Sequence, residues 1–465
     1  MTHPDPAKRT LLGKDQRYNA PWERTFWDIL HPLDSLIRHQ TTSGVFLLSA
    51  TALALVAANS GFAPAYGAFI NTPISLTVGG WVFEEPLRLW VNDGLMAIFF
   101  YSIGLEIKRE MQSGALASFD RAALPFIAAI GGMIGPALIY LSLNPTAPQA
   151  HGWGIPVATD IAFVIGALSL LGSRAPKSMY VFLVTLAIAD DLLSVLVIAL
   201  FYSDDINVGY LGAAGLFTLL LLAANLSGGR RASLYGLLAL CLWFVMLKSG
   251  IHATLAGVIA AFLTPARSKT HPALFSEKMR HLMDRYDASH NDGGTPREDD
   301  AQFPLVQALQ RGADHMGTPL HFFLERLRAP VAFFVLPVFA FVNAGVTLDD
   351  TLWNAMSGDR VWLGVFLGLV FGKCVGIFTT SMLAVRLGIG ALPEGLDPAR
   401  LAGAAMLGGI GFTMAMFIST LAFRDYPLHH LTANIGILMA SVTAGIVGYS
   451  YLSILHRIRS RRVGD

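Results

Sequence analysis

Charged residues are scarce in this chain of 465 residues: Asp, Glu, Lys and Arg make up 14% of it, whereas 54% is hydrophobic. Soluble domains carry about 25% charged residues, so a soluble globular protein is excluded. Cysteine is also nearly absent. Cys241 and Cys374 both lie inside apolar runs, which excludes a disulfide framework and a cysteine-rich metal site. The N-terminal residues lack the pattern of a cleaved signal peptide, so we expect the polar head to be retained.

Long apolar runs fill most of the sequence. A helix needs about 20 apolar residues to cross the hydrocarbon core of a bilayer, and about twelve runs approach that length. We therefore predict an all-α polytopic membrane protein with about twelve transmembrane helices, an even number that places both termini on one side. The runs are residues 42–60, 89–107, 122–143, 155–172, 179–202, 209–227, 232–248, 250–264, 329–348, 361–385, 401–422 and 431–455.

Lys and Arg are distributed unequally between the connecting segments. Most of the 33 lie before the first run, after the last one, or in every second loop between them. The opposite loops carry only Arg88, Lys248, Arg360 and Arg424. Because short basic loops resist translocation, both termini are predicted to be cytoplasmic.

The polar segments divide the chain into five parts. We expect an interfacial helix in the cytoplasmic head and disorder in the middle of the large insertion, which is polar and contains Gly and Pro. The parts are the head (residues 1–41), transmembrane helices 1–8 (42–264), a cytoplasmic insertion (265–328), transmembrane helices 9–12 (329–455) and a basic cytoplasmic tail (456–465).

Residues 74–83 alternate in polarity about Gly79 and Gly80, a pattern typical of a β-hairpin. We predict a small extracytoplasmic hairpin over residues 74–85. An unpaired edge of this ribbon can pair with the same edge of a second copy, so a homodimer is predicted. A simple loop cover is the alternative.

Two adjacent aspartates, Asp190 and Asp191, lie inside the apolar run 181–202. A carboxylate at the bilayer centre costs about 2.5–3.5 kcal/mol, so the pair indicates a functional site. Consecutive residues on a helix are about 100° apart, so each aspartate needs its own surroundings. Lys373, in another apolar run, is a candidate partner for one of them, and the other would then face Asp160.

Two predicted spans are interrupted by Gly, Pro or polar residues, at 152–163 and at 408–414. They are the fourth and eleventh spans, each second in its triplet, and such matched interruptions indicate an inverted-repeat transporter with its site at the bilayer midplane. Glycine for close helix packing is the alternative for either segment alone. Broken helices expose backbone carbonyls, which with Asp160, Thr159 and the paired aspartates suit a hard cation rather than a transition metal.

The sequence also indicates what drives transport. Residues 368–374 differ from a phosphate-binding loop, because three residues separate the glycines and Cys374 replaces Ser or Thr. ATP is therefore not expected as the energy source, and neither a cofactor nor a nucleic-acid partner is predicted. Competition between a cation and protons for the same carboxylates predicts antiport.

Four further residues have two readings each. Asp93 fits a solvated helix start or a place on the ion path. Glu106 and Arg109 fit an ordinary pair three residues apart or a response to pH. His252 fits a hydrogen-bonded residue at a helix end or a group that titrates near neutral pH.

Several of these segments together resemble the NhaA-type bacterial sodium/proton antiporters. The resemblance covers roughly residues 42–265 and 325–455, and implies a multi-pass protein of the bacterial inner membrane with crossed broken helices. It also implies a homodimer, and electrogenic exchange of sodium or lithium for protons that is activated at alkaline pH, serving cytoplasmic pH and sodium homeostasis. The matching segments are Ala158-Thr-Asp-Ile-Ala-Phe163, Ala187-Ile-Ala-Asp-Asp-Leu192, Lys248-Ser-Gly-Ile-His-Ala-Thr-Leu-Ala-Gly257, Gly372-Lys373 and Gly409-Ile-Gly-Phe-Thr-Met414.

The same resemblance implies roles for individual residues. Asp191 becomes the central carrier of sodium and protons, Asp190 its neighbour paired with Lys373, and Asp160 with Thr159 a support for the crossing helices. The cytoplasmic, pH-responsive mouth is implied to contain Glu106, Arg109, His252 and Glu325, and the second broken helix Gly409, Gly411 and Thr413. Three features depart from the family pattern: the long head, the enlarged 265–325 loop, and Cys374 where proline is familiar.

Two other functions fit parts of the pattern. A sodium-coupled symporter of an organic anion is an alternative, because the positive ends of half-helices suit carboxylate substrates. An intramembrane aspartyl protease would use two membrane carboxylates as acid and base. That class requires Tyr-Asp and Gly-x-Gly-Asp within spans, whereas the Tyr-Asp here, Tyr286-Asp287, lies in the insertion.

Overall fold

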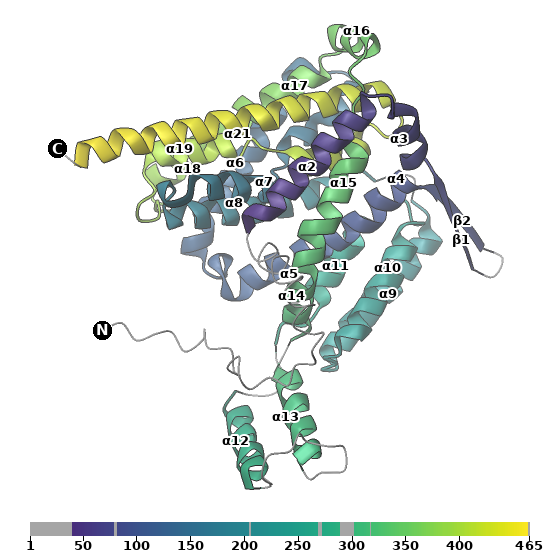
Figure 1. Cartoon of the computed structure of the whole chain (residues 1–465), viewed down its shortest axis with the longest axis vertical. Helices are drawn as coiled ribbons and strands as arrows, with labels where there is room; N and C mark the ends of the chain where they lie inside the picture. Colours follow the sequence, from purple (N-terminus) through teal and green to yellow (C-terminus); the bar gives the residue numbers. More distant parts are fainter. Residues whose placement is uncertain are drawn as a thin grey trace, which may run out of the picture.

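Helices packed side by side form the body of the molecule, and a two-stranded sheet projects from it (Figure 1). The structure is a computed structural model that describes residues 40–78, 81–203, 206–267, 272–288, 302–316 and 318–463. The interfacial helix predicted in the head and the disorder predicted for residues 289–300 both lie outside the described residues.

The first half of the chain contains the hairpin and the helices that carry the paired aspartates. In order these elements are α2 (Gln40–Ala58), α3 (Ala63–Ile70), β1 (Pro73–Val78), β2 (Trp81–Pro86), α4 (Leu87–Leu89), η3 (Trp90–Leu95), α5 (Met96–Ser113), η4 (Ala115–Ala117), α6 (Phe119–Leu143), η5 (Gln149–Val157), α7 (Ile161–Leu171), η6 (Gly172–Arg174), α8 (Lys177–Phe201), α9 (Val208–Leu226), α10 (Ala232–Met246) and α11 (Thr254–Leu263).

The second half contains the insertion helices and the helix that carries Lys373. Its elements are α12 (Pro272–Ala288), α13 (Gln302–Met316), α14 (Pro319–Pro330), η7 (Val331–Val335), α15 (Leu336–Asn343), α16 (Asp350–Gly358), α17 (Val361–Leu367), η8 (Gly368–Gly372), α18 (Lys373–Arg386), α19 (Pro398–Leu407), α20 (Phe412–Ala422) and α21 (Pro427–Val463). In Figure 1, α12 and α13 lie next to each other below the helical body.

Five stretches within the described residues are long and apolar enough to cross a membrane, and counting each bent helix pair as one span raises this to as many as eight. The chain is thus a multi-pass, all-α membrane protein, and the number twelve remains a prediction. The shorter helices explain part of the difference. The run predicted at 250–264, for example, is helical only over Thr254–Leu263, because a turn containing Gly250, with φ +83°, precedes it.

Both predicted interruptions are present as breaks between two helical pieces. The axis bends by 41° between η5 and α7, and by 49° between α19 and α20. The first piece ends at Val157, and Asp160, whose backbone is extended, caps the start of α7 with its side chain. Gly408–Gly411 separate the second pair. A third bend, of 117° between α2 and α3, was not predicted.

The strands β1 and β2 pair antiparallel, with Pro73 opposite Pro86 and Val78 opposite Trp81. The predicted Gly79-Gly80 turn lies outside the described residues. Within the described residues each strand has one partner strand, so its other edge is not covered by a strand. The side of the membrane on which the hairpin lies remains a prediction.

Glycines let α6 and α18 pack backbone to backbone. A Cβ at Gly376 would collide with the carbonyl oxygen of Gly131, and one at Gly135 with that of Gly372. Small residues allow this close approach between membrane helices. One of these contacts involves Gly372, the last residue of the π-helical turn η8, which comes directly before Lys373. The packing of α6 against η8 therefore fixes the position of Lys373.

The last helix secures the start of α19. Asp397 caps α19 through the backbone N–H groups of Ala399 and Arg400, at 3.0 and 3.1 Å. The guanidinium of Arg459, near the end of α21, donates two hydrogen bonds to the same carboxylate, at 2.5 and 2.9 Å. These hydrogen bonds therefore hold the start of α19, one half of the second broken helix, against α21.

Candidate functional site

The pair formed by Asp190 and Lys373 connects α8 with α18. Lys373 Nζ lies 2.7 Å from Asp190 Oδ2, and both side chains are 1% exposed. The same ammonium donates a hydrogen bond to the carbonyl of Val157, the last residue of η5. Lys373 therefore joins three elements, one of which ends at a helix break.

Asp191 lies beside this pair but shares none of its hydrogen bonds. It is also 1% exposed, and its Oδ1 has no hydrogen-bond partner among the described residues. Ser194, three residues further along α8 and hence on the same face, likewise has a buried hydroxyl without a described partner. Two buried oxygens suited to a cation thus lie on one face of α8.

Asp160 has the opposite environment, because its carboxylate is surrounded by donors. Oδ1 accepts hydrogen bonds from the backbone N–H groups of Ala162 and Phe163, at 3.0 and 3.2 Å. Oδ2 accepts from the backbone N–H of Thr413, at 3.0 Å, and from its hydroxyl. The first turns of α7 and α20 both present N–H groups to this carboxylate, where the helix dipoles favour negative charge.

Two more hydrogen bonds tie the breaks directly to each other. The backbone N–H of Asp160 donates to the carbonyl of Ile410, at 2.7 Å, and Thr159 Oγ1 donates to the carbonyl of Gly408, at 3.0 Å. Glycine is needed here, since a Cβ at Gly411 would lie 3.1 Å from the carbonyl oxygen of Ala158 and within 3.0 Å of two side chains.

The charges at this crossing are compensated unequally. Lys373 balances Asp190, and the two helix starts stabilise Asp160. Asp191 has neither kind of compensation from the described residues, and a buried carboxylate without compensation is costly. Binding either a proton or a monovalent cation would remove that cost, which makes Asp191 the candidate position for competition between the two.

The described residues contain no group of three or more His, Cys, Asp and Glu that would hold a tightly bound metal ion. An ion that is held only transiently has different requirements, because it must also leave. One or two carboxylates with hydroxyl and carbonyl oxygens provide the oxygen ligands that hard cations prefer.

Asp93 and His252 lie near each other in space, although both are distant in the sequence from the two helix breaks. Asp93 is in the π-helical turn η3, and its Oδ1 lies 4.0 Å from His252 Nε2. His252 Nδ1 is 3.0 Å from Thr254 Oγ1. This geometry fits the reading of a hydrogen-bonded histidine before a helix, here α11.

Glu106 and Arg109 form the expected pair on α5, with 3.2 Å between Arg109 Nη2 and Glu106 Oε1. The guanidinium lies closer to Glu110, at 2.9 Å. Glu325 is exposed on α14, which packs against α5. These four residues therefore belong to neighbouring helices.

An amide pair was missed by the sequence reasoning. Asn343 Nδ2 donates to Asn92 Oδ1 at 2.8 Å, and Asn92 Nδ2 to Asn343 Oδ1 at 3.3 Å. Both asparagines are buried, and Asn434 on α21 donates to the carbonyl of Asn343, at 3.5 Å. The sequence signal that could have identified this pair was Asn92, a polar residue directly before Asp93 within an apolar run.

Comparison with known proteins identifies relatives along nearly the whole chain. Residues 34–452 match the family model described as Na+/H+ antiporter 1. "Na(+)/H(+) antiporter NhaA 1" of Saccharophagus degradans is 44% identical over 99% of this chain and 99% of its own length. "Na(+)/H(+) antiporter NhaA" of Syntrophobacter fumaroxidans is 42% identical over 96% of this chain and 95% of its own length. The protein of the same name from Oleidesulfovibrio alaskensis is 44% identical over 93% and 95%.

Proposed function

Because this chain belongs to the Na+/H+ antiporter 1 family, a family of transporters rather than enzymes, we propose that it exchanges sodium or lithium ions for protons across the bacterial inner membrane. The observation that carries this proposal is the unequal compensation of three buried carboxylates. Oδ1 has no described partner in either Asp190 or Asp191, but Asp190 is paired with Lys373 through its Oδ2, whereas Asp191 has no described ion pair and shares a helix face with the unpaired Ser194 Oγ.

The proposed cycle follows from that arrangement. When Asp191 is deprotonated, its carboxylate and the Ser194 hydroxyl bind a sodium ion. Protonation of Asp191 removes the negative charge that holds the ion, so the ion leaves. Each form of the site is therefore neutralised by one ligand or the other, and a single site exchanges the two.

The crossing of the broken helices supports alternating access. Asp160 and Thr159 bind the two breaks together, so a movement of one broken helix is passed to the other. Lys373 links this crossing to α8 through Val157 and Asp190. We propose that these residues position the carrier. We also propose that the exchange is electrogenic, which requires a second proton to move in each cycle besides the one that Asp191 binds.

A symporter of organic anions fits the geometry less well. That alternative needs the positive ends of the half-helices for a substrate carboxylate. In this structure the starts of α7 and α20 already donate to Asp160. Those donors are engaged, so the described crossing favours a cation.

We also propose activation at alkaline pH, in support of cytoplasmic pH and sodium homeostasis. Deprotonation at a carboxylate must precede sodium binding in the scheme above, so exchange should increase as pH rises. The proposed pH-responsive mouth consists of Glu106, Arg109, His252 and Glu325, of which Glu106 and Arg109 form an ion pair on α5. A homodimer through residues 74–85 is proposed because each of β1 and β2 has an edge that no strand covers in the described sheet.

The test is sodium-induced proton movement in everted membrane vesicles over a pH series. Sodium or lithium should collapse an imposed pH gradient in the wild type, and Asp191→Asn should abolish the response. Asp425→Asn, at an exposed aspartate, is the matched control and should retain it. Exchange that persists in Asp191→Asn would refute the assignment of the carrier, and sodium uptake that requires an organic anion would favour the symporter.

A further inference from the structure

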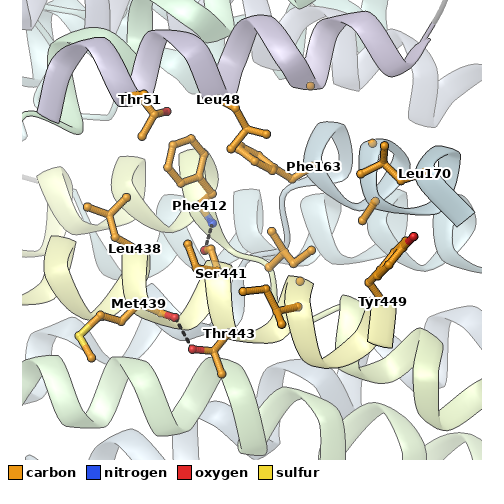
Figure 2. Close-up of a pocket in the computed structure, with 18 of the residues that line it drawn as sticks. Leu48, Thr51, Phe163, Leu170, Phe412, Leu438, Met439, Ser441, Thr443 and Tyr449 are labelled. Carbon is orange, nitrogen blue, oxygen red and sulfur yellow. Dashed lines mark hydrogen bonds between the residues drawn. The ribbon is translucent and has the colours of Figure 1, made fainter. Parts of the chain in front are cut away.

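A long apolar groove of about 890 Å³ runs between α2, α7 and α21. Figure 2 shows α2 along one side, with Leu48 and Thr51, and α21 along the other, from Leu438 to Tyr449. The walls face outward, since Leu48 is 54% exposed and Val442 59%. The groove is therefore open along its length at the surface of the helical body.

The floor of the groove consists of residues that adjoin the ion site. Phe163 and Phe412, in the first turns of α7 and α20, contact each other with ring centroids 4.6 Å apart. The backbone N–H of Phe412 donates to Ser441 Oγ, at 3.1 Å (Figure 2). An occupant of the groove would thus touch the starts of both broken helices, beside Asp160 and Thr413.

The location of the groove determines the chemistry of its occupant. Its walls are membrane-spanning helices, so its open side faces the hydrocarbon of the bilayer, where acyl chains are the abundant apolar molecules. Hydrocarbon gains little by leaving other hydrocarbon. Selective binding therefore needs a polar contact at one end of the groove.

Arg457 supplies such a contact. It is seven residues beyond Ser450, the last groove residue on α21, so it lies on the same face of that helix about 10 Å further along. Its side chain is exposed, whereas Arg459 is engaged by Asp397. A cation at the end of an apolar groove is complementary to a phosphate joined to an acyl chain.

We propose that this groove binds an anionic phospholipid, with one acyl chain along α2 and α21 and the headgroup phosphate at Arg457. A basic residue near an anionic membrane surface contributes about 1 kcal/mol. The expected enrichment of an anionic over a zwitterionic lipid is therefore about fivefold.

A photoreactive benzophenone amino acid at Val442 reads out the occupant. The purified variant would be reconstituted in phosphatidylcholine vesicles that contain a minority of phosphatidylglycerol, irradiated, and analysed by mass spectrometry. The same amino acid at Leu219 of α9, which is 62% exposed and outside the groove, reports the bulk lipid ratio. We expect phosphatidylglycerol adducts at Val442 to exceed that ratio by about fivefold.

Two pairs of variants identify the contacts. Arg457→Gln should return the adducts at Val442 to the bulk ratio, whereas Arg457→Lys should keep the enrichment. Gly445→Phe fills the groove, where a Cβ meets only Ile410, at 3.8 Å, and should reduce adduct yield. Gly212→Phe, at an open position of α9, should leave it unchanged.

Other occupants would overturn the proposal. These outcomes are a crosslink to residues 1–39, a product with the mass of two chains, or a bulk lipid ratio at Val442. The crosslinking result does not depend on ion transport, so it stands or fails separately from the proposed exchange. A further consequence rests on the proposed function: anionic lipid should change the sodium-driven proton flux of the wild type more than that of Arg457→Gln.

Discussion

Replacement of Lys373 by Met should destabilise the protein more than the loss of one surface charge. Lys373 Nζ and Asp190 Oδ2 are 2.7 Å apart and both side chains are 1% exposed, so no solvent screens the pair. Removing one partner of a buried ion pair leaves an uncompensated charge and costs about 3–5 kcal/mol. The variant also loses the hydrogen bond to the Val157 carbonyl, which belongs to the first helix break.

A double-mutant cycle isolates the contribution of the pair. Lys373→Met and Asp190→Leu should each lose about 3–5 kcal/mol of unfolding free energy, whereas the double variant should lie within about 1 kcal/mol of the wild type, because apolar replacements of both partners leave no buried charge. Equilibrium unfolding by denaturant in detergent micelles provides the measurement.

The control is Lys278→Met, since Lys278 is exposed on α12 and surface substitutions usually change stability by about 0.5 kcal/mol or less. If Lys373→Met is no more destabilising than Lys278→Met, the pair does not carry compensating buried charges. If the double variant loses as much as the two single variants combined, Asp190 and Lys373 are not coupled. Either result would refute the charge assignment on which the role of Asp191 rests.

Two further outcomes can be measured in the same way. Gly376→Ala should lower the unfolding free energy by about 1–3 kcal/mol, because its methyl group collides with the carbonyl of Gly131. The control Gly212→Ala, at an open position of α9, should not destabilise the protein. Equal effects of the two substitutions would contradict the close packing of α6 and α18. Hydrogen bonds from Arg459 lower the pKa of Asp397 from its ordinary 3.8 to about 2. The ion pair between Asp397 and Arg459 therefore stabilises the protein fully above pH 3.8, and this stabilisation is lost as the pH falls to about 2. The difference in unfolding free energy between the wild type and Asp397→Asn should be constant above pH 3.8 and should decrease between pH 3.8 and about 2. A difference that stays constant over the whole pH range would contradict a stabilising ion pair between Asp397 and Arg459.

The breaks in two spans could be predicted because glycine, proline and polar side chains interrupt apolar runs. The resemblance to the antiporters added the pairing of Asp190 with Lys373. Contacts between distant segments were less accessible. Asn92 and Asn343 are separated by 251 residues, and no local pattern states that they meet.

Backbone geometry was the other limit of prediction from the sequence. The carbonyl of Val157 accepts from Lys373 only because η5 ends at that residue, and any residue type supplies a carbonyl. The bend between α2 and α3 had a local signal in Gly61 and Pro64, which directly follow the predicted run 42–60. Ser194 was visible three residues after Asp191, yet a serine in a membrane helix commonly bonds to its own backbone.

The π-helical turn η8 sets the direction in which Lys373 leaves its helix. Such a turn closes its hydrogen bond over five residues instead of four, so Gly368–Gly372 hold one residue more than an α-helical turn would. In a regular α-helix one extra residue would rotate everything beyond it by about 100°, whereas the wider turn of η8 takes up the extra residue without that rotation. The direction of this ammonium therefore depends on η8 keeping its wide turn: regular α-helical bonding over the same residues would turn Lys373 away from Asp190 while every side chain of the site remains.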